Sequence, residues 1–109
     1  MTAATVTRPM EHSTPGERRV ARALVRLLLD ADGTISVDDG GEFTVKRSRS
    51  LRQITEALAT TGEDTLLVRD AEGKRKGVIL LVWGNDETGE ELIADYTASH
   101  FLDCIVESI

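Results

Sequence analysis

The sequence is poor in the residues from which many functional sites are built. Its 109 residues include one cysteine, Cys104, and two histidines, His12 and His100. One cysteine excludes an intrachain disulfide, and two histidines leave no spacing typical of a zinc site. We therefore expect no metal and no cofactor.

Apolar segments that could enter or cross a membrane are also missing. No apolar run approaches the roughly 20 residues of a membrane-spanning helix, and no apolar segment of a signal peptide follows the first basic residue. We expect a cytoplasmic protein with no membrane partner.

Known motifs for nucleotide binding and catalysis are absent as well. Neither G-x-x-x-x-G-K-[ST] nor G-x-G-x-x-G occurs. His100 and Cys104, four residues apart, could pair on one helix face as base and nucleophile. No third group is suggested to orient them, and a structural cysteine is the simpler interpretation. We assign no catalytic residue and expect a protein that is not an enzyme.

What the chain does contain is typical of one folded domain. Hydrophobic residues make up 40% and charged residues 29% of the sequence, and the length allows a single core. Residues 1–12 show no periodicity and are expected to form a flexible arm. Residues 13–109 are expected to form one α+β domain.

The first half of this domain shows clear start and stop signals. Thr14-Pro15-Gly16-Glu17 is a capping box that predicts a helix, whose apolar residues Val20, Leu24, Leu27, Leu28 and Ala31 fall on one face. Residues 34–46 alternate around Asp38-Asp39-Gly40-Gly41 and predict a hairpin, with Ile35, Val37, Phe43 and Val45 on the inner face. Ser50 begins a second helix with a capping box to Gln53, and Gly62 is expected to end it.

The second half reads as three strands and a helix. Residues 65–69, 77–83 and 92–96 are the predicted strands, and Thr97 or Ser99 caps the last helix. Because no strand–helix–strand alternation occurs, we expect an antiparallel sheet with helices on one side. The predicted fold is α+β, with about five antiparallel strands and three helices in the order αββαβββα.

The central strand, residues 77–83, is apolar on both faces. A strand of this kind is expected to be covered on both sides, by a helix, by the N-terminal arm or by another chain. We take Ile79, Leu81 and Trp83 as the apolar face for a homodimer or a partner.

Negative charge is concentrated at the C-terminal end of the sequence. The net charge is −6, and residues 77–109 contain seven acidic residues and no Lys or Arg. A surface of one sign favours a protein partner of the opposite sign, although acidic residues also keep small domains soluble. The predicted partner-binding residues are Asp86, Glu87, Glu90, Glu91 and Asp95.

Basic residues suggest an alternative surface in the first half. Arg18, Arg22 and Arg26 repeat every four residues, and further cations surround the start of the second helix. Such a surface could follow a phosphate backbone, but a solvated helix face explains the same spacing, so nucleic acid is the less favoured partner. The residues of this alternative basic face are Arg18, Arg22, Arg26, Lys46, Arg47, Arg49 and Arg52.

Several short runs of strand and turn residues carry a resemblance to other proteins. They are Thr34-Ile35-Ser36-Val37-Asp38-Asp39-Gly40, Val45-Lys46-Arg47-Ser48, Glu63-Asp64-Thr65-Leu66, Gly84-Asn85 and Ala94-Asp95-Tyr96-Thr97. In these runs, which fall within residues 17–97, the chain resembles small uncharacterised proteins encoded by phages and prophages. The resemblance transfers no activity and no functional residue. It implies that the chain acts by binding a host protein. Anti-CRISPR-type blockers of bacterial defence complexes are one class of proteins that act in this way.

These observations together predict a non-enzymatic protein-binding module. Its narrowest version is a phage-type inhibitor that blocks a bacterial defence complex sterically and electrostatically. The alternative is a small regulator associated with nucleic acid, acting through the arginines of the first helix.

Overall fold

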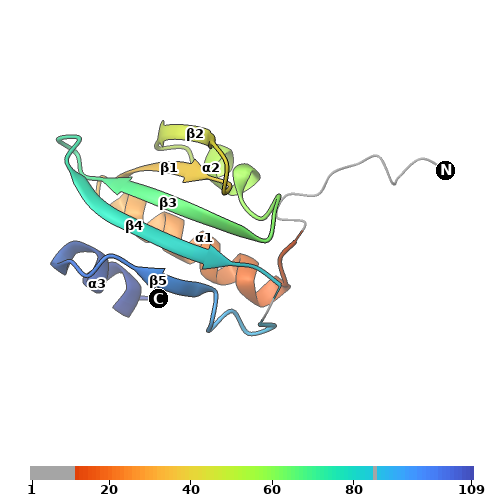
Figure 1. The fold of residues 1–109 in the computed structure, drawn as a ribbon. Coiled ribbons are helices and arrows are strands. Elements are labelled where there is room, and N and C mark those ends of the chain that lie inside the picture. Colours follow the sequence, from red (N-terminus) through yellow and green to blue (C-terminus); the bar gives the residue numbers. More distant parts are fainter. Residues whose placement is uncertain (1–11, 85) are drawn as a thin grey trace.

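The structure is a computed structural model that describes residues 12–84 and 86–109, so that most of the predicted N-terminal arm lies outside the described residues. The predicted α+β fold is confirmed: three helices and five antiparallel strands follow one another in the expected order (Figure 1). The elements are α1 (Pro15–Asp30), β1 (Thr34–Asp38), β2 (Phe43–Ser48), α2 (Leu51–Ala57), β3 (Glu63–Arg69), β4 (Arg75–Val82), β5 (Ile93–Tyr96) and α3 (His100–Glu107).

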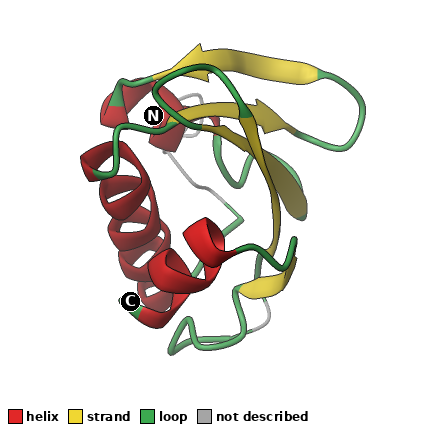
Figure 2. Ribbon diagram, turned by 90° about the vertical axis from the view of Figure 1, so that its left-hand side faces the viewer, coloured by secondary structure: helices red, strands yellow, loops and turns green. Residues whose placement is uncertain are grey.

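The five strands form one sheet in the order β2-β1-β3-β4-β5. The helices lie on one face of this sheet, and the sheet curves around them (Figure 2). We call the side that faces the helices the inner face and the opposite side the outer face. Among the described residues, no helix has both the length and the apolarity needed to cross a lipid bilayer.

Helix α1 begins as the sequence predicts. Thr14 is the N-cap, Pro15 occupies the first turn, and Thr14 and Glu17 form the two hydrogen bonds of a capping box. The buried stripe is rotated slightly from the expected one: Ala21 and Val25 are fully buried, whereas Val20 is only partly buried. This rotation leaves Val20 at the edge of the core.

Helix α2 ends earlier than predicted. Its last residue is Ala57, and the chain turns at Ala59, which is buried and adopts a left-handed φ of 57°. The prediction that Gly62 ends this helix was therefore wrong. Left-handed alanine is uncommon, and the buried carboxylate of Asp64 accepts a hydrogen bond from its N–H group at 2.8 Å.

The central strand β4 is apolar on both faces, but the assignment of its free face was wrong. Ile79 and Leu81 are completely buried and Trp83 is 5% exposed, because these three side chains face the helices. They cannot form a surface for a homodimer or a partner. The outer face instead carries the half-buried Val78, Leu80 and Val82.

Phe43 also lies on the other face from the one predicted. The pairing of β1 with β2 is irregular, so that Val37 lies opposite Val45 and the next residue, Asp38, lies opposite Phe43. One residue of β2 is thus skipped, which reverses the side of every residue beyond it. Val45 is buried in the core, whereas Phe43 is 43% exposed.

Candidate functional site: an apolar groove with an acidic rim

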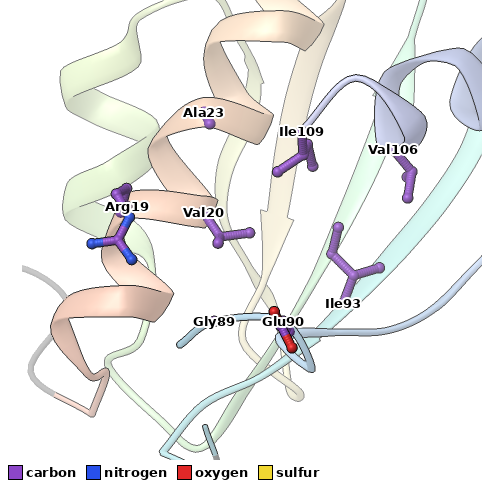
Figure 3. A pocket seen from close by; sticks show the side chains of 8 residues that line it. All are labelled: Arg19, Val20, Ala23, Gly89, Glu90, Ile93, Val106 and Ile109. Carbon is purple, nitrogen blue, oxygen red and sulfur yellow. The ribbon is translucent and has the colours of Figure 1, made fainter. Parts of the chain in front are cut away.

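A groove of about 520 Å³ lies on the inner side of the fold, between α1, the loop before β5, β5 itself and the end of α3. The side chains of Val20, Ile93 and Ile109 point into the same space (Figure 3). Arg19 and Glu90 bring the charged groups to this lining. The lining residues are Arg19, Val20, Ala23, Gly89, Glu90, Ile93, Val106 and Ile109.

The buried carboxylate of Glu17 fixes one wall of the groove. Besides accepting a hydrogen bond from Thr14 N at 2.9 Å, it accepts from Gly84 N at 2.8 Å and from Asp86 N at 3.3 Å. Thr14 Oγ1 in turn donates to Asp86 O at 2.8 Å. The N-terminus of α1 and the loop after β4 are therefore held together by a residue that the sequence identified only as half of a capping box.

Two glycines allow the loop to approach α1 closely. A Cβ on Gly16 would collide with the carbonyl oxygen of Glu87, and a Cβ on Gly89 would lie 2.5 Å from the carbonyl oxygen of Gly16. Gly89 also has a φ of 84°, which favours glycine. The position of the loop that carries the acidic residues thus depends on both glycines.

The loop is further ordered by Asp86. Its Oδ1 accepts hydrogen bonds from the hydroxyl and the backbone N–H of Thr88, and its Oδ2 accepts from Glu91 N at 2.8 Å. These hydrogen bonds lower the pKa of Asp86 below its ordinary value, and the bond from the Thr88 hydroxyl has the largest effect. We predicted that Asp86 contacts a partner. Its carboxylate is instead occupied by hydrogen bonds within the loop.

The remaining predicted acidic residues divide into two places. Glu87, Glu90 and Glu91 are exposed on the loop, and none of them forms an ion pair with a described residue. Asp95 lies opposite Leu80 in the register of β5 with β4, which places it on the outer face. Of the five residues, the structure thus brings only Glu90 to the lining of the groove, and Glu87 and Glu91 belong to the same loop.

The predicted basic face is divided as well. Lys46 and Arg47 line a pocket on the outer face together with Arg69, whereas the arginines of α1 lie on the helix side of the sheet. Several of the others are engaged locally. Arg18 donates to Ser13 O, Arg49 lies 3.7 Å from Asp32, and Arg52 pairs with Glu56 at 2.9 Å; Arg22 and Arg26 are exposed.

The other candidate groups do not assemble into a site. Cys104 Sγ lies 3.7 Å from His100 Nε2, with both residues exposed, and no described residue donates to or accepts from the second ring nitrogen of His100. Within the described part of the chain, no three His, Cys, Asp or Glu residues gather where they could hold a metal ion.

Sequence reasoning missed the groove and the buried acid Asp64. The groove is built from residues far apart in the chain, each of which looks like an ordinary core residue in its own segment. Asp64 had a local signal, because it continues the alternation of the buried Leu66 and Val68 along β3.

Comparison of the chain with protein-family models, with curated proteins and with solved structures found no match.

Proposed function

We propose that the chain is a non-enzymatic protein-binding module whose groove accepts an apolar side chain from a basic segment of its partner. The observation that carries the proposal is the position of Glu90, which brings negative charge to the lining of a groove whose other residues, apart from Arg19, are uncharged. Apolar anchors held in pockets supply much of the affinity of protein interfaces, and charges at the rim steer the encounter.

The apolar part of the groove is suited to such an anchor. Val106 and Ile93 are half-buried, and Ile109 is 45% exposed, so that a partner side chain would cover surface that now contacts water. Burial of apolar surface is favourable by roughly 25 cal/mol per Å² before the cost of association is subtracted.

The acidic part supports a basic partner. Glu87, Glu90 and Glu91 have no ion-pair partners among the described residues, and the Glu17 contacts hold the start of their loop against α1. Charges on a fixed loop lose less entropy on binding than charges on a mobile one.

The narrower proposal is an inhibitor that occupies a basic surface of a bacterial defence complex. It is supported by the resemblance to phage-type proteins and by the acidic rim, which would compete with nucleic acid for such a surface. Its test is direct: expression of the chain in a bacterium with an active defence complex should raise the plating efficiency of a targeted phage.

The general proposal is tested by affinity capture with matched variants. The tagged full chain and the variant Glu87→Gln/Glu90→Gln/Glu91→Gln are each incubated with nuclease-treated bacterial lysate, and the bound proteins are compared by mass spectrometry. We expect a stoichiometric protein that the wild type retains and the triple variant loses. With that protein purified, the dissociation constant of the triple variant should rise at least tenfold at low salt.

Two further variants separate the groove from general charge effects. Ile109→Ser removes an exposed apolar side chain of the groove without changing charge, and it should also weaken binding. Arg22→Gln/Arg26→Gln changes the exposed face of α1 and should leave affinity within about twofold. Unchanged affinity in both the triple variant and Ile109→Ser would contradict the proposal.

A further inference from the structure

A second pocket, of about 220 Å³, lies on the outer face of the sheet, across the sheet from the groove. It is formed where β2, β1 and β3 lie side by side. Three cationic side chains, one hydroxyl and two apolar side chains surround it. The lining residues are Ser36, Phe43, Lys46, Arg47, Leu67 and Arg69.

The polar groups of this pocket are hydrogen-bond donors. Neither Lys46 nor Arg47 forms an ion pair with a described residue. Arg69 donates through Nη1 to Gly73 O, but its Nε has no accessible surface and no hydrogen-bond partner among the described residues. Because this Nε is inaccessible, a ligand in the pocket would meet the charge of Arg69 and its outer nitrogens and not this buried donor.

Ser36 adds a hydroxyl at the floor of the pocket. Its Oγ accepts a hydrogen bond from Arg47 N at 2.9 Å, and the described residues provide no acceptor for its proton. Ser36 is 5% exposed, so this proton has little access to water. The pocket therefore offers positive charge and O–H and N–H donors, which match the oxygens of an anion such as phosphate.

Charge is distributed unevenly along the pocket. Arg75 lies opposite Arg69 in the register of β4 with β3, and Asp70, the acid next to Arg69, is paired with Lys76 at 3.3 Å. The other end has the exposed ring of Phe43 and the acidic Asp38 opposite it. An anionic group is thus favoured at the arginine end and a planar uncharged group at the Phe43 end.

We propose that this pocket binds a phosphate ester that carries a planar base, namely a nucleotide, either free or as a unit of single-stranded nucleic acid. The phosphate contacts Lys46, Arg47 and Arg69, and the base stacks on Phe43. Stacking of a base on an aromatic ring next to cations is a common physical basis for binding single strands without sequence preference. This site is independent of the groove and does not rest on its proposed function.

The test uses the full chain and fluorescence anisotropy at low ionic strength. A fluorescein-labelled oligothymidylate of ten nucleotides is titrated with protein, and thymidine monophosphate and inorganic phosphate then compete with it. We expect saturable binding, with the nucleotide displacing the probe at lower concentration than phosphate does. An oligonucleotide that binds at least tenfold more tightly than the mononucleotide identifies a strand as the ligand, and similar affinities identify the free nucleotide.

Variants at exposed positions assign the binding to this pocket. Phe43→Ala should raise the dissociation constant about tenfold. Lys46→Gln/Arg47→Asn should lower the slope of log affinity against log salt by roughly 1.4, since each phosphate contact on a single strand contributes about 0.7. Asparagine is chosen at position 47 because the φ there is 47°, which asparagine tolerates.

The matched control is Arg22→Gln/Arg26→Gln, which removes the same charge from α1. It should leave both the dissociation constant and the salt slope unchanged. Equal losses in the control and in the pocket variants would show general electrostatic attraction and overturn the proposal. Absence of saturable binding, or competition by phosphate as effective as that by the nucleotide, would overturn it too.

Discussion

The indole N–H of Trp83 donates a hydrogen bond of 2.8 Å to Oδ2 of Asp64 in the interior of the protein. The same oxygen accepts from Ala59 N at 2.8 Å, whereas Oδ1 has no hydrogen-bond partner among the described residues. One carboxylate thus joins the start of β3, the end of β4 and the left-handed turn after α2. Burial of this group raises the pKa of Asp64 to about 6, although both hydrogen bonds act in the opposite direction.

This raised pKa predicts an unusual dependence of stability on pH. The pKa of Asp64 in the folded protein lies above its ordinary value of 3.8, so folding takes up a proton between the two values. The contribution of Asp64 to the free energy of unfolding is full below about pH 4 and is lost as pH rises through about 6. A shift of two units corresponds to about 3 kcal/mol.

The measurement is urea unfolding of the wild type and Asp64→Asn at pH 4 and pH 7. Asparagine cannot ionise, and its carbonyl oxygen can still accept from Trp83 and Ala59. We expect the wild type to lose stability relative to Asp64→Asn between pH 4 and pH 7, by up to about 3 kcal/mol. Parallel profiles for the two proteins would contradict this assignment.

The sequence was sufficient for the order of the elements because its signals there are local. The capping box of Thr14 and Glu17 and the turn at Asp38 to Gly41 depend on neighbouring residues alone. The side on which Phe43 lies depends instead on one irregular pair between β1 and β2, which no local pattern reveals. The same limit applies to the candidate site, because the lining of the groove meets only after the chain has folded.

The hydrogen bonds of Glu17 predict that even the conservative substitution Glu17→Gln causes a large loss of stability. Glu17→Gln replaces one carboxylate oxygen by an NH2 group, which would face either the N–H groups of Thr14 and Gly84 or the N–H group of Asp86. Loss of hydrogen bonds to a buried charged group costs about 2 to 3 kcal/mol. We expect this decrease in the free energy of unfolding, measured in urea at pH 7, together with faster hydrogen exchange at Asp86 N, because the amide oxygen can keep the bonds from Thr14 and Gly84.

Glu87→Gln is the matched control, because Glu87 is exposed on the loop that Glu17 contacts and the substitution removes the same charge. It should alter stability by less than about 0.5 kcal/mol. Similar effects of the two substitutions would show that the contacts of Glu17 do not hold the loop.

Alanine substitutions at Gly89 and Gly73 distinguish the stability cost of moving the loop away from α1 from the cost of backbone strain. Both have a positive φ, 84° and 81°, but a Cβ on Gly89 would meet Gly16 O and the side chain of Val20, whereas a Cβ on Gly73 would meet nothing within 4 Å. Gly73→Ala should therefore cost only the strain, about 1 kcal/mol. Gly89→Ala should cost about 1 to 3 kcal/mol more, since the loop must move.

Displacement of the loop should also weaken partner binding without any change in charge. Affinity for the captured partner is therefore measured for both alanine variants after circular dichroism has verified that each is folded. Equal stability of Gly73→Ala and Gly89→Ala would show that the loop does not need its contact with α1.

Leu80 and Leu81 are neighbours in β4 that test the assignment of the two faces. Leu81 is completely buried against the helices, and Leu80 is half-buried on the outer face. Leu81→Ala leaves a cavity in the core and should cost about 2 to 5 kcal/mol. Leu80→Ala should cost about 1 kcal/mol or less, because its surface is already partly in water. Urea unfolding at micromolar concentration measures both.

The same pair decides where two copies of the chain would meet if they associate. Leu81 is inaccessible, so a homodimer through β4 must use Val78, Leu80 and Val82 instead of the three residues that sequence reasoning chose. We expect any concentration dependence of the mass measured by sedimentation to disappear in Leu80→Lys, which adds a charge at the centre of that row. A concentration dependence that persists in this folded variant would place the contact elsewhere, because an unpaired lysine between two apolar faces would be too costly to bury.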